Sequence, residues 1–214
     1  MIRRLNIATL MLALVVSLTA ADALVAQSGS GAKRPQTAPP AGQAAPKAVP
    51  RSAPAPSPAA APAPVIVVDT DKGTFEFTTF PKEAPKSVEH ILGLVKRNFY
   101  NGMRIHRQIP GFIVQFGDPL SRDLSKQESW GTGGSFNIVG VGEPSSKRTH
   151  VTGAVAMAYP GKDPRQADSQ MYIMLAPRHS LDGDYTVIGQ VIAGMDVVQK
   201  LVKGDIIRRV SVKP

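Results

Sequence analysis

Residues 105–119 read IHRQIPGFIVQFGDP, in which two short apolar runs flank a Pro-Gly-Phe segment. Proline and glycine favour chain reversal, so this stretch is expected to form a β-hairpin. A three-residue loop at 110–112 would set Ile109 opposite Ile113. The hairpin therefore commits this part of the chain to an antiparallel sheet.

The same hairpin places a charge on an apolar face. Strand side chains alternate with a period of two, so Ile105, Arg107 and Ile109 are expected to share one face, with Arg107 opposite Gln115 on the returning strand. A lone arginine in such a place is most often a satisfied residue at the rim of a sheet. The alternative is a surface site in which a guanidinium and a carboxamide act together, with Phe112 at its end.

The first 64 residues differ in composition from the rest of the chain. Residues 1–26 combine a short basic start, an apolar run and small residues, which is typical of a secretory signal peptide with an uncertain cleavage site. An uncleaved membrane anchor is the alternative, although the apolar run is shorter than the ~20 residues that span a bilayer. A periplasmic or secreted protein is therefore expected, with membrane attachment only if the leader is uncleaved.

Residues 27–64 consist mostly of Ala, Pro, Gly, Ser and Gln, with ten prolines. Such a segment has little to bury and is expected to be a disordered linker. A plain spacer is favoured over a ligand for another module's aromatic groove or a substrate of the chain's own site.

Charge and cysteine content exclude several function classes. The chain carries a net charge of +9, but residues 1–64 hold six of the 25 Lys and Arg and one of the 16 Asp and Glu, which leaves +4 for the remainder. No basic stripe is interleaved with aromatic residues, so nucleic-acid binding is not expected. There is no cysteine, and the four histidines lack paired ligand spacing, so neither a metal nor a cofactor is expected.

Residues 65–214 have the length of one domain. Residues 65–78 read as a hairpin around Asp71-Lys72-Gly73, and a helix begins at Ala84-Pro85, with His90 on its polar face. A second helix is expected at 195–202 and a last strand near 206–212. Many strands with two helices favour a closed, mainly β structure.

The hairpin string resembles the signature of the cyclophilin-type peptidyl-prolyl cis-trans isomerases, in which an arginine precedes Ile-Pro-Gly-Phe and a glutamine and Gly-Asp follow. Five later segments agree in order and spacing: GTGGSF from Gly131, VTGAVAMA from Val151, DSQMYIML from Asp168, SLDGDYTVIGQV from Ser180 and GMDVVQKL from Gly194. The resemblance covers about 70% of the chain. It implies a closed eight-stranded antiparallel barrel capped by two α-helices and an isomerase that acts on proline-containing segments of unfolded proteins and assists their folding. The leader adds the expectation that these are exported proteins, and a monomer is expected.

The resemblance also implies a role for each residue of the site. Arg107 would stabilise the twisted amide, and Gln115 would orient the arginine. Tyr185 would donate a hydrogen bond to the rotating carbonyl. The substrate-binding residues would be Phe112, Ile113, Tyr172 and Leu181 around the prolyl ring, and Ala158, Tyr159 and Gln170 along the substrate chain.

Several positions depart from the family pattern. Ile113 and Tyr172 stand where many relatives have Met and Phe, and activity is expected to survive both changes. Tyr185 stands where many relatives have His, and it can still donate a hydrogen bond. Phe116 replaces the first glycine of Gln-Gly-Gly-Asp, and Tyr159 replaces an Asn. Ser180 stands where eukaryotic relatives often have the Trp associated with tight cyclosporin binding, so weak cyclosporin binding is expected.

Other functions fit the sequence less well. His179, Ser180 and Asp182 lie close together as in a hydrolase, but Leu-Asp-Gly-Asp reads as a plain turn. His106 is expected to be a structural hydrogen-bonding residue rather than a base. The main alternative is a non-catalytic module or chaperone of the same fold that binds proline-containing segments. Retention of Arg107, Phe112, Gln115 and Gln170 together favours the isomerase.

Overall fold

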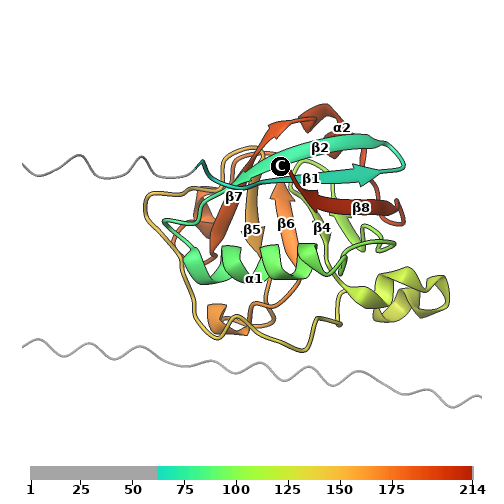
Figure 1. Ribbon diagram of the computed structural model, residues 1–214, viewed down its shortest axis with the longest axis horizontal. Helices are drawn as coiled ribbons and strands as arrows, with labels where there is room; N and C mark the ends of the chain where they lie inside the picture. The colour runs from blue at the N-terminus through green and yellow to red at the C-terminus, as the bar shows by residue number, and fades with distance from the viewer. Residues whose placement is uncertain (1–61, 214) are drawn as a thin grey trace, which may run out of the picture. The chain divides into compact units, whose positions relative to one another are not determined.

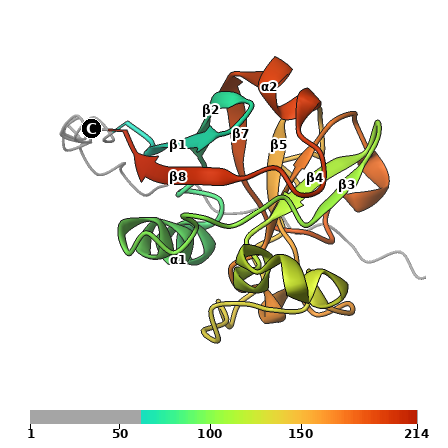
Figure 2. The same ribbon diagram turned by 90° about the vertical axis from the view of Figure 1, so that its right-hand side faces the viewer.

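The computed structural model describes residues 62–213, and the predicted leader and the linker up to residue 61 lie outside them. Eight strands form one antiparallel sheet in the order β3-β4-β6-β5-β7-β2-β1-β8, which curls around a core (Figures 1 and 2). The strands are β1 (Val65–Thr70), β2 (Gly73–Thr79), β3 (Arg107–Ile109), β4 (Ile113–Phe116), β5 (Ala154–Met157), β6 (Met171–Met174), β7 (Val187–Ala193) and β8 (Ile207–Val212).

Two α-helices lie at opposite ends of the curled sheet (Figures 1 and 2). Helix α1 (Pro85–Lys96) begins at the predicted proline, whereas α2 (Met195–Lys200) ends two residues before its predicted end. Within residues 62–213 neither helix has the length and apolar character needed to cross a membrane. The loops also contain four 3-10 helices that were not predicted: η1 (Pro119–Arg122), η2 (Leu124–Ser129), η3 (Pro164–Gln166) and η4 (His179–Leu181).

The two edge strands of the sheet meet at a short seam. Residues 102–105, which precede β3, exchange backbone hydrogen bonds with residues 204–207, which lead into β8 and include its first residue. Ile105 N–H donates to the Asp205 carbonyl at 2.9 Å, and Gly204 N–H donates to the Ile105 carbonyl at 2.8 Å. Where the sequence predicted a closed barrel, the described residues therefore form a curled eight-stranded sheet whose edges are joined by this seam rather than by a strand ladder between β3 and β8.

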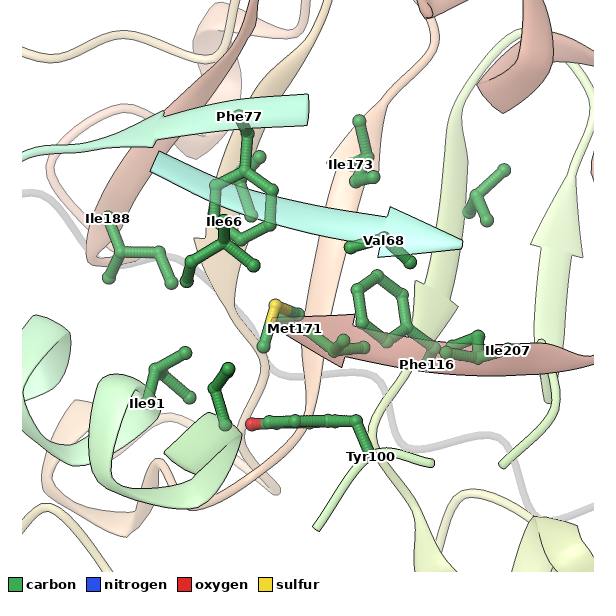
Figure 3. Close-up of a cluster of buried hydrophobic side chains, with 14 of the residues drawn as sticks. Ile66, Val68, Phe77, Ile91, Tyr100, Phe116, Met171, Ile173, Ile188 and Ile207 are labelled. Carbon is green, nitrogen blue, oxygen red and sulfur yellow. The ribbon is translucent and has the colours of Figure 1, made fainter. Parts of the chain in front are cut away.

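Alternation along the central strands separates two apolar clusters. On β4, Val114 and Phe116 point into the interior core, while Ile113 packs in a smaller cluster on the outer face. The interior cluster gathers residues from most strands and both helices; Figure 3 labels Ile66, Val68, Phe77, Ile91, Tyr100, Phe116, Met171, Ile173, Ile188 and Ile207. Burial of both faces explains why β4, β5 and β6 are buried at every position. The outer cluster becomes the floor of the site.

Two side chains lie where the sequence did not place them. Ile105 was expected on the face of Arg107, but it is fully buried in the interior core. Strand β3 begins only at Arg107, so the period of two does not extend back to Ile105. His90 was expected on a solvated helix face, but its side chain is only 10% exposed and lies 3.5 Å from Asp168. A helix-face pattern cannot show that a distant loop covers that face.

Candidate active site

The β3-β4 hairpin sets the position of the predicted arginine. The observed register pairs Arg107 with Gln115 and Ile109 with Ile113, which confirms the prediction from the three-residue turn. The Nη1 of Arg107 donates a hydrogen bond to Gln115 Oε1 at 3.2 Å. The arginine side chain is exposed, so its guanidinium lies on the surface with one edge held by the neighbouring strand.

A chain of amide hydrogen bonds anchors Gln115 in turn. Its Nε2 donates to Gln170 Oε1 at 2.9 Å, and Gln170 Nε2 donates to the carbonyls of Gly131 and Gly133 at 2.9 and 2.7 Å. Each amide is oriented by the next, and backbone carbonyls end the chain. The guanidinium is thus positioned by a network that reaches from the hairpin to the 131–134 loop.

Beside the arginine is a pocket with a volume of about 210 Å³. Nine of the ten predicted site residues line it: Arg107, Phe112, Ile113, Gln115, Ala158, Tyr159, Tyr172, Leu181 and Tyr185. The tenth, Gln170, is hydrogen-bonded to Gln115. The structure therefore brings all ten residues together, from three strands and three loops, while their individual roles remain predictions.

A second hollow of about 480 Å³ adjoins the first and shares Gln115, Ala158 and Tyr159 with it. The remaining lining residues are Gly131, Thr132, Gly133, Gly134, Phe136, Pro160, Gln166, Asp168 and Gln170. Apart from Gln170, sequence reasoning assigned none of these a role. Five of them lie in the segment GTGGSF, and Asp168 begins DSQMYIML; both segments matched the family pattern, but these residues had no assigned function.

Three tyrosine rings lie next to one another in the lining of the pocket. The rings of Tyr159 and Tyr185 stack with centroids 4.8 Å apart, and Tyr172 meets Tyr185 edge-on at 5.9 Å. The Tyr159 hydroxyl donates to the Asp184 carbonyl at 2.6 Å. Burial, and secondarily the neighbouring Tyr185, raises the pKa values of both Tyr159 and Tyr172, so both remain phenols at neutral pH.

The buried hydroxyl of Tyr172 contacts a histidine that sequence reasoning did not connect to the site. Nε2 of His150 lies 3.0 Å from Tyr172 Oη, and Nδ1 of the same ring lies 2.9 Å from Asp182 Oδ1. Partial burial acts to raise the pKa of Asp182, but hydrogen bonds from His150 and His179 outweigh it and lower the pKa to about 2. Asp182 is therefore a carboxylate at neutral pH.

His106, next to the arginine, is buried, and neither ring nitrogen has a hydrogen-bond partner within residues 62–213. Gln170 is close enough to raise the pKa of His106, but its contact with the ring is not a well-formed hydrogen bond, so the expected hydrogen-bonding role stays a prediction. Burial lowers the pKa of its imidazole to about 4; Asp118 opposes this shift and Arg107 adds to it. The ring is neutral at physiological pH and serves as packing beside the arginine.

This buried imidazole predicts a pH-dependent stability. An unfolded histidine titrates near pKa ~6.5, so between about pH 6.5 and pH 4 the unfolded chain binds a proton that the folded chain does not. The free energy of unfolding should thus be highest above pH 6.5 and fall by about 3 kcal/mol as the pH drops to 4. Urea unfolding of the wild type and of His106→Gln at pH 4 to 7 measures this difference. The same slope in both proteins would contradict the assignment, and His179→Gln, which changes a 67% exposed side chain, should retain it.

The alternative sites find no support in the described residues. His179 Nδ1 lies 2.9 Å from Asp182 Oδ2, but the Ser180 hydroxyl makes no hydrogen bond with either histidine in residues 62–213, so no nucleophilic triad is assembled there. In the same residues no three His, Cys, Asp or Glu side chains come together as metal ligands.

Comparisons with known proteins agree on one family. The family model described as "Cyclophilin type peptidyl-prolyl cis-trans isomerase/CLD" matches residues 65–214. A probable peptidyl-prolyl cis-trans isomerase of Brucella abortus is 39% identical over 142 residues, 65% of this chain and 71% of its own length. Peptidyl-prolyl cis-trans isomerase B of Bacillus subtilis is 34% identical over 67% of this chain and 93% of its own length.

The fold is similar to that of a solved structure. A cyclophilin type peptidyl-prolyl cis-trans isomerase of Cryptosporidium parvum, crystallised in the presence of the dipeptide Ala-Pro, has a TM-score of 0.61 with this chain. The match covers 70% of this chain and 99% of the solved chain, at 23% sequence identity. At this identity the likeness concerns the fold.

Proposed function

Because the chain belongs to the cyclophilin-type peptidyl-prolyl cis-trans isomerase family, we propose that its pocket accelerates rotation about X-Pro bonds and that Arg107 stabilises the twisted amide. One observation supports this most directly. The guanidinium of Arg107 lines a pocket that also presents the apolar side chains of Phe112 and Ile113. Within residues 62–213 its only hydrogen-bond partner is Gln115, and no carboxylate pairs with it. Its remaining N–H groups are free for a substrate.

The chemistry of amide rotation requires such a group. The X-Pro bond resists rotation with a barrier of about 20 kcal/mol because the nitrogen lone pair is delocalised into the carbonyl. As the bond twists, the lone pair localises on the prolyl nitrogen, where a guanidinium N–H can hold it. The interaction is stronger in the twisted state than in either planar state, so it lowers the barrier. No proton needs to be transferred.

The rest of the site would hold the substrate in place. Phe112, Ile113 and Leu181 offer apolar walls for the prolyl ring, with Tyr172 as the fourth. The Tyr185 hydroxyl, which makes no hydrogen bond with the described residues, would donate to the rotating carbonyl. The backbone at Ala158 and Tyr159, together with Gln170, would bind the residues before proline. Because Arg107 is exposed, the substrate itself must cover the guanidinium and exclude water.

The substrate class follows from the openness of the site and from the predicted leader. We propose that the protein acts as a monomer on proline-containing segments of exported or unfolded proteins in the periplasm or outside the cell, and that it assists their folding. The support for the location is the basic and apolar start of the chain, which is typical of a signal peptide. Sequencing the amino terminus of the mature protein by mass spectrometry tests the location.

Catalysis separates this proposal from the alternative of a module that only binds proline segments. The purified chain should accelerate cis-trans exchange in an Ala-Pro peptide, measured by NMR exchange spectroscopy without a coupled protease. Binding of the peptide with no acceleration would instead support the non-catalytic module.

Cyclosporin should bind weakly. Ser180 is exposed in η4, beside Leu181 of the pocket, and lacks the broad apolar surface of the tryptophan that stands there in many eukaryotic relatives. We expect a micromolar or weaker Kd by calorimetry, and Ser180→Trp should tighten it by about tenfold, equivalent to ~1.4 kcal/mol. Nanomolar binding to the wild type would contradict this expectation, and Ser125→Trp in the exposed part of η2 is a matched control.

A further inference from the structure

We infer that His150 is a positioning residue for isomerisation, because it ties together the two walls of the pocket that receive the prolyl ring. The inference rests on the proposed function, since it concerns the pocket assigned there. One wall is Tyr172 on β6, and the other is the 178–185 loop, which contributes Leu181 and Tyr185. His150 belongs to neither wall and does not line the pocket, but it is bonded to both.

The contacts of His150 run in two directions from one fully buried ring. Toward β6, Nε2 meets Tyr172 Oη at 3.0 Å. Toward the loop, Nδ1 meets Asp182 Oδ1 at 2.9 Å, and the backbone N–H of His150 donates to the same oxygen at 2.7 Å. The His150 carbonyl also accepts a hydrogen bond from Arg178 N–H at 2.8 Å. The loop is thus attached to His150 on both sides of Leu181.

With the His150 ring uncharged, the donors and acceptors along these hydrogen bonds have one consistent arrangement. A carboxylate accepts hydrogen bonds and cannot donate, so Nδ1 of His150 must carry the proton that Asp182 accepts. In the neutral ring Nε2 is then an acceptor, and the Tyr172 hydroxyl donates to it. The Asp182 carboxylate therefore fixes the tautomer of His150, and this tautomer makes the Tyr172 hydroxyl the donor. The hydrogen bond in turn holds the Tyr172 ring in its place in the pocket wall.

A satisfied buried histidine is often only structural, but two features favour a positioning role. Tyr172 lines the pocket and forms the last hydrogen bond of this series, with Nε2 of His150. Many relatives have phenylalanine at this position, which could not form that bond. In addition, the prolyl ring must be held while the neighbouring bond twists, and a 1 Å misplacement of reacting groups can cost about 100-fold in rate. Loosening either wall should therefore affect rotation more than binding.

A double-mutant cycle tests whether His150 acts through Tyr172. His150→Asn keeps a donor near Asp182 but does not reach Tyr172, and Tyr172→Phe removes the other end of the same hydrogen bond. Each change should lower kcat by about tenfold, within the range that small misplacements produce, with little change in KM. In the double variant the loss should be no greater than in the more impaired single variant.

Asp182→Asn gives a second test at a partly exposed position. Losing the carboxylate should remove the preference for the Nδ1–H tautomer of His150, visible in the ¹⁵N chemical shifts of the ring, and should lower kcat by a similar factor. His179→Asn is the matched control, because His179 bonds to the other oxygen of Asp182 but lies outside the pocket; its kcat should equal that of the wild type.

The outcomes separate this inference from the proposed function. If the wild type isomerises the peptide but His150→Asn and Tyr172→Phe have multiplicative effects, or change KM rather than kcat, the positioning role is overturned and the isomerase stands. Unchanged kcat in His150→Asn and Asp182→Asn, with both variants folded by near-UV circular dichroism, would also overturn it. A wild type that binds the peptide without accelerating exchange would overturn both.

Discussion

Replacing Arg107 by alanine should lower kcat/KM for an Ala-Pro peptide by about a thousandfold, while peptide binding changes little. Removing one group that stabilises charge in a transition state typically costs 10²–10³ in kcat, and here a single guanidinium is assigned to the prolyl nitrogen. The apolar walls that bind the planar substrate remain in the variant. NMR exchange spectroscopy gives the rate, and chemical-shift titration of the same samples gives the Kd.

Two further variants make this result specific to the geometry of the site. Arg107→Lys keeps the charge but loses the planar guanidinium, which can donate to Gln115 and to the substrate at the same time. The lysine variant should therefore recover only part of the rate. Arg209→Ala removes an exposed arginine on β8, away from the pocket, and should behave as the wild type. Equal rates in the wild type and Arg107→Ala would exclude the proposed mechanism.

Phe116→Ala should destabilise the folded protein by about 3–5 kcal/mol, the range observed when a buried aromatic side chain is removed. Phe116 is 1% exposed and packs in the interior core with Tyr100, whose ring it meets edge-on at a centroid distance of 6.2 Å (Figure 3). The cavity left behind could not be filled without moving the strands around it. Urea unfolding at constant m-value measures the loss.

Phe136→Ala provides a matched control for this experiment. Phe136 is 96% exposed in the loop before β5, so the same substitution there should change stability by no more than about 0.5 kcal/mol. Because Phe116 points away from the outer face, folded Phe116→Ala should also keep kcat/KM within about threefold of the wild type. Similar stability of the two variants, or a large loss of activity in folded Phe116→Ala, would contradict this placement of the side chain.

Local signals were enough to predict the hairpin that carries the arginine. A turn of fixed length determines register, so Arg107 could be placed opposite Gln115 before any tertiary contact was known. The family pattern then identified residues distant in sequence, such as Leu181 and Ala158, that the structure brings to one pocket. Both predictions rested on features that depend little on the surrounding chain.

The predictions that failed concern contacts between distant segments. The half-buried His90 is covered by Asp168, and the partner of Tyr172 is His150; neither pair has a sequence spacing that would reveal it. Ile105 departs from the expected face because β3 begins only at Arg107, and Ile105 belongs instead to the seam. Phe116 could not be placed from the sequence, since alternation assigns it to a face but does not say which face is the interior.

We expect the seam also to delay the point during folding at which Arg107 reaches its place. Ile105 is hydrogen-bonded to Gly204 and Asp205, which lie about 100 residues later in the chain. Arg107 comes only two residues after Ile105. Contacts between such distant segments form late, after the intervening chain has closed a long loop. A chain still being synthesised can therefore build the α1 and β1-β2 region early, but its arginine is fixed at the pocket only after the segment before β8 has been made.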